Sequence, residues 1–274
     1  MTTYSVLMSV YFKEKPDFLK QSMCSIWKQS AQTNDFVLVC DGPLGEELNA
    51  VIQDMQKLFG DVLHVVRLAE NGGLGHALNE GMKYCKNDLI ARMDSDDIAY
   101  PDRCERQLKI FEKFPSVSIS SGIVQEFTQS TAYIDTKRIP PETQEEILLF
   151  AKKRNPFNHP CVMYRKSAVQ AAGGYQDFYL LEDYYLWIRM LMNGVIGYNL
   201  QEPILWMRAG RDMYKRRAGW RYAQSQRKLF AFMYHNNFIT FSMYVMSSAV
   251  RGISSMLPNC IRQTLFLKLL RKSV

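Results

Sequence analysis

Short apolar runs alternate with helical repeats of apolar residues along the first half of the chain. Runs of apolar residues predict strands, and apolar residues spaced three or four positions apart predict helices between them. The expected strands cover residues 4–10, 36–40, 62–68 and 89–93, and the expected helices cover residues 16–29, 46–59, 74–84 and 101–114. This alternation favours an α/β fold with a mostly parallel sheet and right-handed crossovers.

The second half follows a less regular pattern. Strands are expected at residues 117–127, 132–139, 161–164, 196–200 and 204–207, and helices at residues 142–153 and 182–192. No internal repeat or flexible linker divides residues 1–207, so we expect one domain there.

Composition places the chain among ordinary globular proteins, with 47% hydrophobic and 22% charged residues in 274. Its six cysteines are scattered, which favours reduced thiols in the cytosol and argues against a zinc cluster. The N-terminus enters a strand pattern without a signal-like segment. The longest uncharged apolar run, residues 238–250, is shorter than the about 20 residues that a membrane span needs. We therefore expect a cytoplasmic protein.

Charge is distributed unevenly along the chain. From Arg208 onward there are 13 Lys and Arg but one acidic residue, a net +12, so residues 1–207 carry −5 of the total of +7. A basic, aromatic-rich tail on an acidic body predicts an anionic partner, which could be phosphate, nucleic acid or a lipid surface. We expect residues 208–274 to form a basic helical extension, with an active-site closing loop and membrane-surface helices.

An acidic run follows the fourth expected strand. The apolar run 89–93 ends at Asp94, Ser95, Asp96 and Asp97. Unpaired buried carboxylates are costly, so this run should lie at the open end of a strand, facing a cation. An Asp-x-Asp pair offers the hard oxygen ligands that suit Mg²⁺ or Mn²⁺ with a phosphate group.

Two other polar sites also follow strands. Asp41-Gly42 comes after the second strand and Asn71-Gly72-Gly73 after the third, so both should meet the acidic run at one sheet edge, where α/β sheets bind ligands. Taken alone, Asp41 is better explained as a turn residue before glycine than as a carboxylate that accepts a base N–H from a nucleotide. The glycine run 72–75 lacks the dinucleotide-binding spacing and favours a tight turn near a nucleotide.

Glu182-Asp183 opens the last expected helix of the domain. These acidic residues could simply complement the helix dipole. Alternatively, one of them serves as a general base, since a helix N-terminus keeps a carboxylate ionised. Asn158-His159-Pro160 is a strand-entry turn with a satisfied histidine, or else it lines an acceptor pocket or reaches the metal.

Basic residues with aromatics follow the last expected strand. This group is a solvated surface, or it closes over a diphosphate, to which arginine binds in bidentate fashion. Its candidate members for that role are Arg208, Arg216, Arg217 and Trp220. Residues 260–274 have the pattern of a basic amphipathic helix for an anionic lipid surface. The alternative is a helix that packs on the domain or on another subunit, giving a homo-oligomer.

Together these motifs resemble one enzyme family. Residues 5–11, Asp41-Gly42, Asn71-Gly72-Gly73, residues 91–97, Asn158-His159-Pro160 and Glu182-Asp183-Tyr184 are similar to family 2 glycosyltransferases of GT-A fold. Within that family, the chain is most similar to bacterial enzymes of amylovoran, capsule and O-antigen assembly, some of which add galactose to a lipid-diphosphate-linked N-acetylglucosamine.

The resemblance implies a role for each motif. It places the catalytic base on Asp183, with Glu182 beside it, and the metal on Asp96 with Asp94, with His159 as a further candidate ligand. It places the acceptor or its diphosphate on Asn158, His159 and the basic group. It places the nucleotide-sugar on Tyr11, Asp41, Asn71, Gly72, Arg92, Asp94 and Ser95.

The implied reaction is an inverting single displacement. A UDP-sugar such as UDP-galactose gives its hexose to a polyprenyl-diphosphate-linked glycan, with Mn²⁺ or Mg²⁺ as cofactor, on the inner face of the bacterial plasma membrane. A nucleotidyltransferase or phosphatase could use the same carboxylates. A nucleic-acid-binding module ranks last, because the acidic body offers no continuous basic groove, and we expect no nucleic-acid partner.

Overall fold

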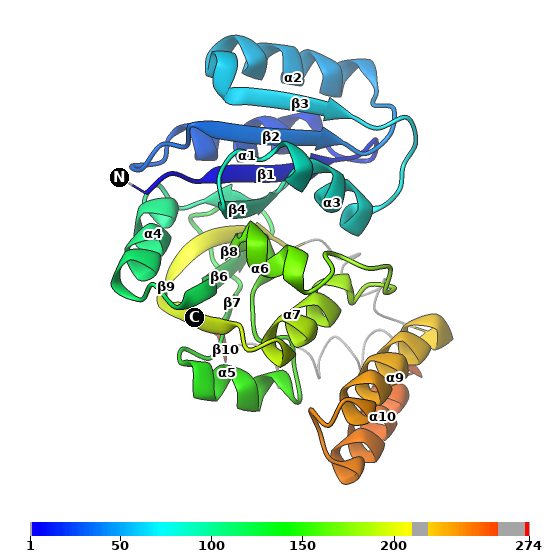
Figure 1. Cartoon of the computed structure of the whole chain (residues 1–274). Helices are drawn as coiled ribbons and strands as arrows, with labels where there is room; N and C mark the ends of the chain where they lie inside the picture. The colour runs from blue at the N-terminus through cyan, green and yellow to red at the C-terminus, as the bar shows by residue number, and fades with distance from the viewer. Residues whose placement is uncertain (1, 210–218, 257–271, 274) are drawn as a thin grey trace.

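The protein is described by a computed structural model that covers residues 2–209, 219–256 and 272–273. Its first four strands run parallel in the order β3-β2-β1-β4, as the alternating pattern predicts. They are β1 (Ser5–Val10), β2 (Asp35–Cys40), β3 (Leu63–Arg67) and β4 (Leu89–Asp94). The crossovers between them are α1 (Pro16–Trp27), α2 (Glu46–Phe59) and α3 (Leu74–Tyr84) (Figure 1).

Beyond β4 the sheet becomes mixed. In the described part of the chain, its order continues from β4 through β8, β6 and β7 to β10, and each of these neighbours pairs antiparallel. These strands are β6 (Val117–Phe127), β7 (Thr136–Arg138), β8 (Met163–Arg165) and β10 (Lys272–Ser273). Strand β9 (Ile196–Arg208) runs parallel to β6 and also pairs with the short β5 (Ile98–Ala99).

The remaining helices lie around this mixed half. They are α4 (Arg103–Lys113), α5 (Gln144–Ala151), α6 (Lys166–Ala171), α7 (Glu182–Met192), α9 (Gly219–His235) and α10 (Phe241–Met256). Helices α9 and α10 form an antiparallel pair beyond α7, away from the parallel strands (Figure 1). Among the described residues, no helix has the length and apolar character that crossing a bilayer requires.

Some expected elements differ from the structure. The two strands expected at 196–200 and 204–207 are one continuous strand, β9. The strand expected at 132–139 shrinks to β7, and residues 159–161 form a 3-10 turn before β8. Most of the helix expected at 260–274 lies outside the described residues, but Lys272 and Ser273 pair with β7 as a strand.

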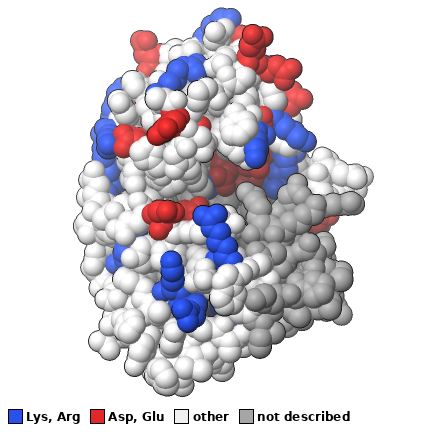
Figure 2. Space-filling view, turned by 90° about the vertical axis from the view of Figure 1, so that its right-hand side faces the viewer, with Lys and Arg blue, Asp and Glu red and all other residues white. Residues whose placement is uncertain are grey.

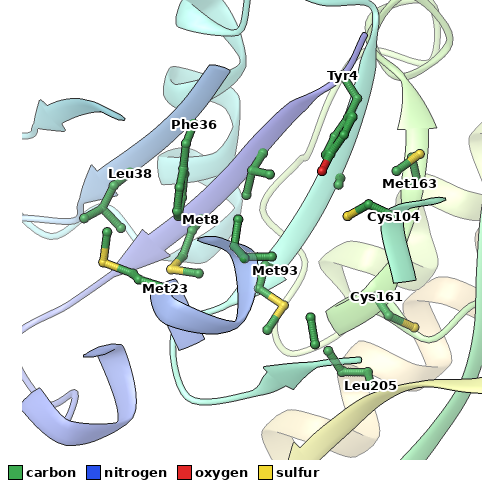
Figure 3. Packing of buried hydrophobic residues seen from close by; sticks show 14 of the residues in the cluster. Tyr4, Met8, Met23, Phe36, Leu38, Met93, Cys104, Cys161, Met163 and Leu205 are labelled. Atoms are coloured by element: carbon green, nitrogen blue, oxygen red, sulfur yellow. The ribbon is translucent and has the colours of Figure 1, made fainter. Parts of the chain in front are cut away.

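The core lies on both faces of the sheet. Successive residues of β1 point to opposite faces, so Val6 and Met8 pack with α1, α2 and α4, and Leu7 packs with α3. Figure 3 shows the first of these layers, where Met23 of α1 lies beside Met8 and Leu38. The second layer also includes Trp187 of α7 and Phe230 of α9, so part of the expected extension shares a core with the expected domain.

The five described cysteines are free, and four of them are buried. This agrees with the expectation of reduced thiols.

Candidate active site

Two polar motifs meet at the carboxyl edge of the parallel strands. Cys40, which precedes Asp41, pairs with Val10 of β1, and Asp94 pairs with Ser9 of β1. Asp41 and Asp94 therefore follow the strands on either side of β1 at nearly the same level. This is the edge on which the sequence predicts a ligand site.

Asp94, Asp96 and Asp97 form a compact acidic cluster. One carboxylate oxygen from each lies within 4.8 Å of the others. Burial, and then the charges of Asp94 and Glu14, raises the pKa of Asp96 to about 7. The Asp97 Oδ2 atom is buried and has no hydrogen-bond partner among the described residues. Three close oxygen ligands that include such an atom fit a hard divalent cation. His159, the further candidate ligand, is not part of this cluster.

Arg208 holds the acidic turn from the end of β9. Its backbone N–H donates to Asp97 Oδ1 at 2.8 Å, and its Nε donates to the Asp96 carbonyl at 3.0 Å. Its guanidinium also stacks on Phe18, 3.8 Å from the ring centre. Arg208, a predicted diphosphate ligand, therefore supports the acidic turn in the structure.

Arg92 is buried beneath the cluster. Its guanidinium forms an ion pair with Asp94, and the side chain is 1% exposed. Its Nε and Nη1 atoms have no hydrogen-bond partner in the described part of the chain. Arg92 is a predicted nucleotide-binding residue, but in this position it is covered by protein and bonds to Asp94.

Asp41 organises the turn after β3. Its carboxylate accepts hydrogen bonds from the backbone N–H of Gly72 at 2.8 Å and of Gly73 at 3.1 Å, and from Asn71 Nδ2 at 3.0 Å. Gly42 has a φ of +85°, and a Cβ atom there would lie 2.7 Å from the Asn71 nitrogen. Glycine is thus required for the two loops to approach, and the structure brings Asp41, Asn71 and Gly72 together.

Ser95 and Tyr11 directly follow β4 and β1 and differ in exposure. The Ser95 hydroxyl donates to Glu14 Oε2 at 2.5 Å, and Ser95 is 6% exposed. Tyr11 is 40% exposed and packs edge-on against Phe12. Only the Tyr11 side chain is therefore open to a ligand.

The first turn of α7 carries Glu182 and Asp183. Asp183 accepts hydrogen bonds from Asn155 Nδ2 and from the Tyr184 backbone N–H, both at 2.6 Å. These two donors hold its carboxylate in one orientation. For Glu182, burial and then the charge of Asp183 raise the pKa to about 7.

A pocket of about 410 Å³ lies between α7 and the glycine turn. Gly72, Gly73, Tyr175 and Glu182 are among its lining residues. Leu180, which also lines it, has a φ of +57°, a strained backbone conformation for a leucine. The turn that Asp41 holds and the helix that carries Asp183 thus border one hollow.

Asn158 and His159 are engaged within the protein. Asn158 Nδ2 donates to the Gly122 carbonyl at 2.8 Å. His159 Nε2 lies 3.0 Å from the Tyr175 hydroxyl, and burial lowers the pKa of His159 well below its usual value. His159 is therefore a neutral histidine in a satisfied site. Of the other predicted acceptor ligands, Trp220 is 65% exposed at the start of α9, and Arg216 and Arg217 lie outside the described residues.

One buried charge links the acidic cluster to α7. The charge of Arg92 acts on Asp94 and Asp97 and also on Glu182. The acidic cluster and the first turn of α7 therefore both lie within electrostatic reach of the same buried guanidinium. Figure 2 shows acidic side chains gathered in a hollow near the middle of this side of the molecule.

The sequence does not indicate three residues near these motifs. Glu14 adds to the acidic surroundings, Asn155 orients Asp183, and Tyr175 pairs with His159. These three depend on contacts between distant segments, for which the sequence holds no local signal. Asp97 belongs to the acidic run that is expected to face a cation, and the structure adds it to Asp94 and Asp96 as a third candidate ligand.

A family model described as Glycosyl transferase family 2 matches residues 5–173. The chain belongs to glycosyl transferase family 2. Among the curated relatives, an uncharacterized glycosyltransferase of Haemophilus influenzae is 39% identical over 98% of this chain and 99% of its own length. The amylovoran biosynthesis glycosyltransferase AmsE of Erwinia amylovora is 38% identical, over 97% of this chain and 98% of its own.

A third relative of this family 2 glycosyltransferase has a more specific name. It is the UDP-Gal:alpha-D-GlcNAc-diphosphoundecaprenol beta-1,3-galactosyltransferase of Escherichia coli, 35% identical over 98% of this chain and 97% of its own length. Family membership decides against a nucleotidyltransferase, a phosphatase and a nucleic-acid-binding module.

Solved structures confirm the fold. Residues 1–349 of S. aureus TarS, in complex with UDP-GlcNAc, align with a TM-score of 0.68 and 16% identity, covering 98% of this chain and 76% of that one. The mannosyltransferase PcManGT of Pyrobaculum calidifontis, in complex with GDP-Man and Mn2+, aligns with a TM-score of 0.65 and 13% identity, covering 97% of this chain and 79% of that one. The GT-A fold expected from the sequence is therefore confirmed.

Proposed function

We propose that this glycosyltransferase moves a hexose from a UDP-sugar to a lipid-diphosphate-linked saccharide in bacterial polysaccharide assembly, with inversion at the anomeric carbon. The names of the amylovoran and galactosyltransferase relatives support this substrate class. The observation that carries the proposal is the acidic cluster at the end of β4, which shares the nearby buried charge of Arg92 with Glu182 of α7.

In this mechanism Asp183 is the general base. The hydrogen bond from Asn155 aims its carboxylate, which takes the proton from the attacking acceptor hydroxyl. The oxygen attacks the anomeric carbon on the face opposite the departing UDP, so a single displacement converts an α-linked donor into a β-linked product. Glu182 lies beside the base and lines the pocket.

Asp96 and Asp94, joined by Asp97, would hold the divalent cation. When bound, Mg²⁺ or Mn²⁺ supplies positive charge that stabilises the departing diphosphate. Arg92 and Arg208 keep these ligands in place, Arg92 by its ion pair with Asp94 and Arg208 through the turn.

Attachment to an anionic membrane surface completes the proposal. Helix α10 exposes an uncharged face that includes Phe241, Val245, Met246 and Val250. Residues 219–256 contain four Lys or Arg and no acidic residue. Figure 2 looks at the side on which this helix pair lies, and the lower third of that view carries blue but no red. An apolar helix face with basic surroundings fits an anionic bilayer.

The direct test is transfer of labelled sugar from a panel of UDP-hexoses to a lipid-diphosphate-linked acceptor, with and without Mn²⁺ or Mg²⁺. Asp183→Asn should lower kcat by about 10²- to 10⁴-fold, because it removes the base and keeps the shape. Asp96→Asn should weaken Mn²⁺ binding.

Asp54→Asn is the matched control, because Asp54 lies exposed on α2 and pairs with Lys57. It should behave like the parent. Full activity of Asp183→Asn or full metal affinity of Asp96→Asn would remove the role assigned to that residue.

A further inference from the structure

An acceptor that carries a diphosphate needs cations near the base. In an acceptor with one sugar on its diphosphate, such as the one that the Escherichia coli relative is named for, the diphosphate and the reacting hydroxyl belong to the same sugar, so the diphosphate would lie about one ring away from Asp183. Arg208 lies at the acidic turn after β4 instead, where it donates to the Asp96 carbonyl and to Gln21.

The segment that orients Asp183 carries a cation. Asn155 donates to Asp183 at 2.6 Å, and the preceding residue is Arg154. Consecutive Cα atoms lie only about 3.8 Å apart, so the Arg154 backbone is close to the base. Arg154 is exposed, and among the described residues no carboxylate forms an ion pair with it.

Helix α10 brings a second cation to the same segment. Arg251 donates hydrogen bonds to the Lys153 carbonyl and, at 3.2 Å, to Gln226 Oε1, and it stacks on Phe230. Burial, and then the charge of Arg251, lowers the pKa of Arg154. The two guanidinium groups are therefore close enough to repel each other.

The Tyr184 phenol also links Arg251 to the base. It lies on the residue after Asp183, and the charges of both Arg251 and Asp183 act on it. Its hydroxyl donates to the Ala151 carbonyl at 2.6 Å, which ties α7 to the segment that leads into Arg154. Arg154 thus belongs to, and Arg251 bonds to, the segment 151–155 that contacts the first turn of α7, and among the described residues neither arginine forms an ion pair with a carboxylate.

We propose that Arg154 and Arg251 form the binding site for the diphosphate of the lipid-linked acceptor. The inference rests on the proposed function and adds to it a binding site for the diphosphate of the acceptor. Guanidinium groups bind phosphate oxygens in bidentate fashion, and a diphosphate would relieve the repulsion between these two cations. Arg251 belongs to α10, the helix proposed to lie at the membrane, where a lipid-linked diphosphate is located.

The test is steady-state kinetics in neutral detergent, with the donor and the acceptor varied in turn. Arg154→Ala should raise KM for a lipid-diphosphate acceptor by about 10- to 100-fold, the loss expected for a charge-assisted hydrogen bond. It should leave KM for the UDP-sugar, and KM for a neutral alkyl glycoside of the same sugar, within about twofold of the parent. Arg154→Lys should recover part of the loss.

Arg154 is the primary site to change, because Arg251 also supports the position of α10. Arg251→Lys, which keeps the charge but not the bidentate fork, should raise the same KM. Arg227→Ala, on the exposed face of α9, is the matched control and should change neither KM.

Each result that contradicts the inference would point to a different role for the two arginines. An equal rise of KM for the neutral glycoside would indicate a structural role, and a rise of the donor KM would assign the arginines to UDP. A loss of binding to phosphatidylglycerol vesicles with no change of KM in detergent would assign them to lipid headgroups. Any of these overturns the inference. A parent enzyme that transfers to no diphosphate acceptor would instead refute the proposed function.

Discussion

Two neighbouring acidic residues at the start of α7 have different surroundings. Asp183 accepts hydrogen bonds from Asn155 and Tyr184, which stabilise its charge. Glu182 lies beside Gly75 of α3, where burial disfavours its charge. These surroundings favour Asp183 as the ionised base and leave Glu182 able to change protonation near neutral pH.

Replacing Glu182 should therefore change stability in a pH-dependent way. Its folded-state pKa of about 7 lies above the ordinary 4.5, so the folded state is destabilised as the pH rises through this range and carries the full cost above it. Glu182→Gln removes this cost. We expect the variant to be more stable by at most about 3 kcal/mol near pH 8, falling to about 1 kcal/mol near pH 5.

The measurement is urea unfolding of the parent and of Glu182→Gln across this pH range. Asp177→Asn, an exposed acid at the same pocket, should give no comparable gain. A gain for Glu182→Gln that stays constant with pH would show that Glu182 is ionised as in water.

At the residue scale, the sequence predicts the kind of site better than it predicts which side chains contact one another. The acidic run indicates a metal site because the carboxylates are adjacent in the chain. It cannot show that Arg92 is buried, or that Arg208 supports the acidic turn from a position 111 residues beyond Asp97 in the chain. A basic residue beside a carboxylate site is equally compatible with binding a ligand and with holding the protein's own acids.

At the scale of elements, β9 shows why the second half is harder to predict. The polar residues Gln201 and Glu202 and the following Pro203 suggest a break between two strands. The structure keeps one strand and accommodates the extra residues in a register shift, where Leu200 pairs with Gly122 and Pro203 with Ile123. A bulge of this kind depends on the partner strand, so local pattern does not indicate it.

The packing of helix α3 against the sheet can be tested at one glycine. Gly81 lies against β1 and β2, and a Cβ atom there would come within 2.5 Å of Leu7 Cδ1 and Val39 Cγ2. Gly81→Ala should destabilise the fold by about 1–3 kcal/mol, because the buried valine cannot move aside. Gly252→Ala in α10 meets nothing within 4 Å and should stabilise it by about 0.5–1 kcal/mol.

Urea denaturation of both variants measures the contrast. Both variants replace a helical glycine by alanine. If helix propensity alone mattered, both would have a higher free energy of unfolding than the parent. A stabilised Gly81→Ala would mean that α3 does not pack closely on the sheet.

At the scale of the whole molecule, helices α9 and α10 connect the core around α7 to an exposed surface. Helix α9 packs Leu229, Phe230 and Met233 into the core that holds Trp187 of α7. Helix α10 continues the basic region but leaves apolar residues exposed. The proposed membrane surface is therefore joined through a shared core to α7, the helix that carries the proposed base.

The exposed face of α10 should therefore carry membrane binding. Val245 is 48% exposed and Met246 is 59% exposed, and both lie in the middle of the helix. The double change Val245→Glu and Met246→Glu places two charges where an apolar face would enter the interface, and adds repulsion from anionic lipid. We expect binding to phosphatidylglycerol vesicles in a flotation assay to fall at least about tenfold.

Leu149→Glu is the matched control, because Leu149 is 58% exposed on α5, outside the proposed surface. It should bind vesicles like the parent. Activity on a water-soluble acceptor should survive the double change, since neither residue belongs to the catalytic site. Unchanged flotation of the double variant would show that α10 does not contact the bilayer, and loss of activity on the soluble acceptor would mean that the face supports the fold instead.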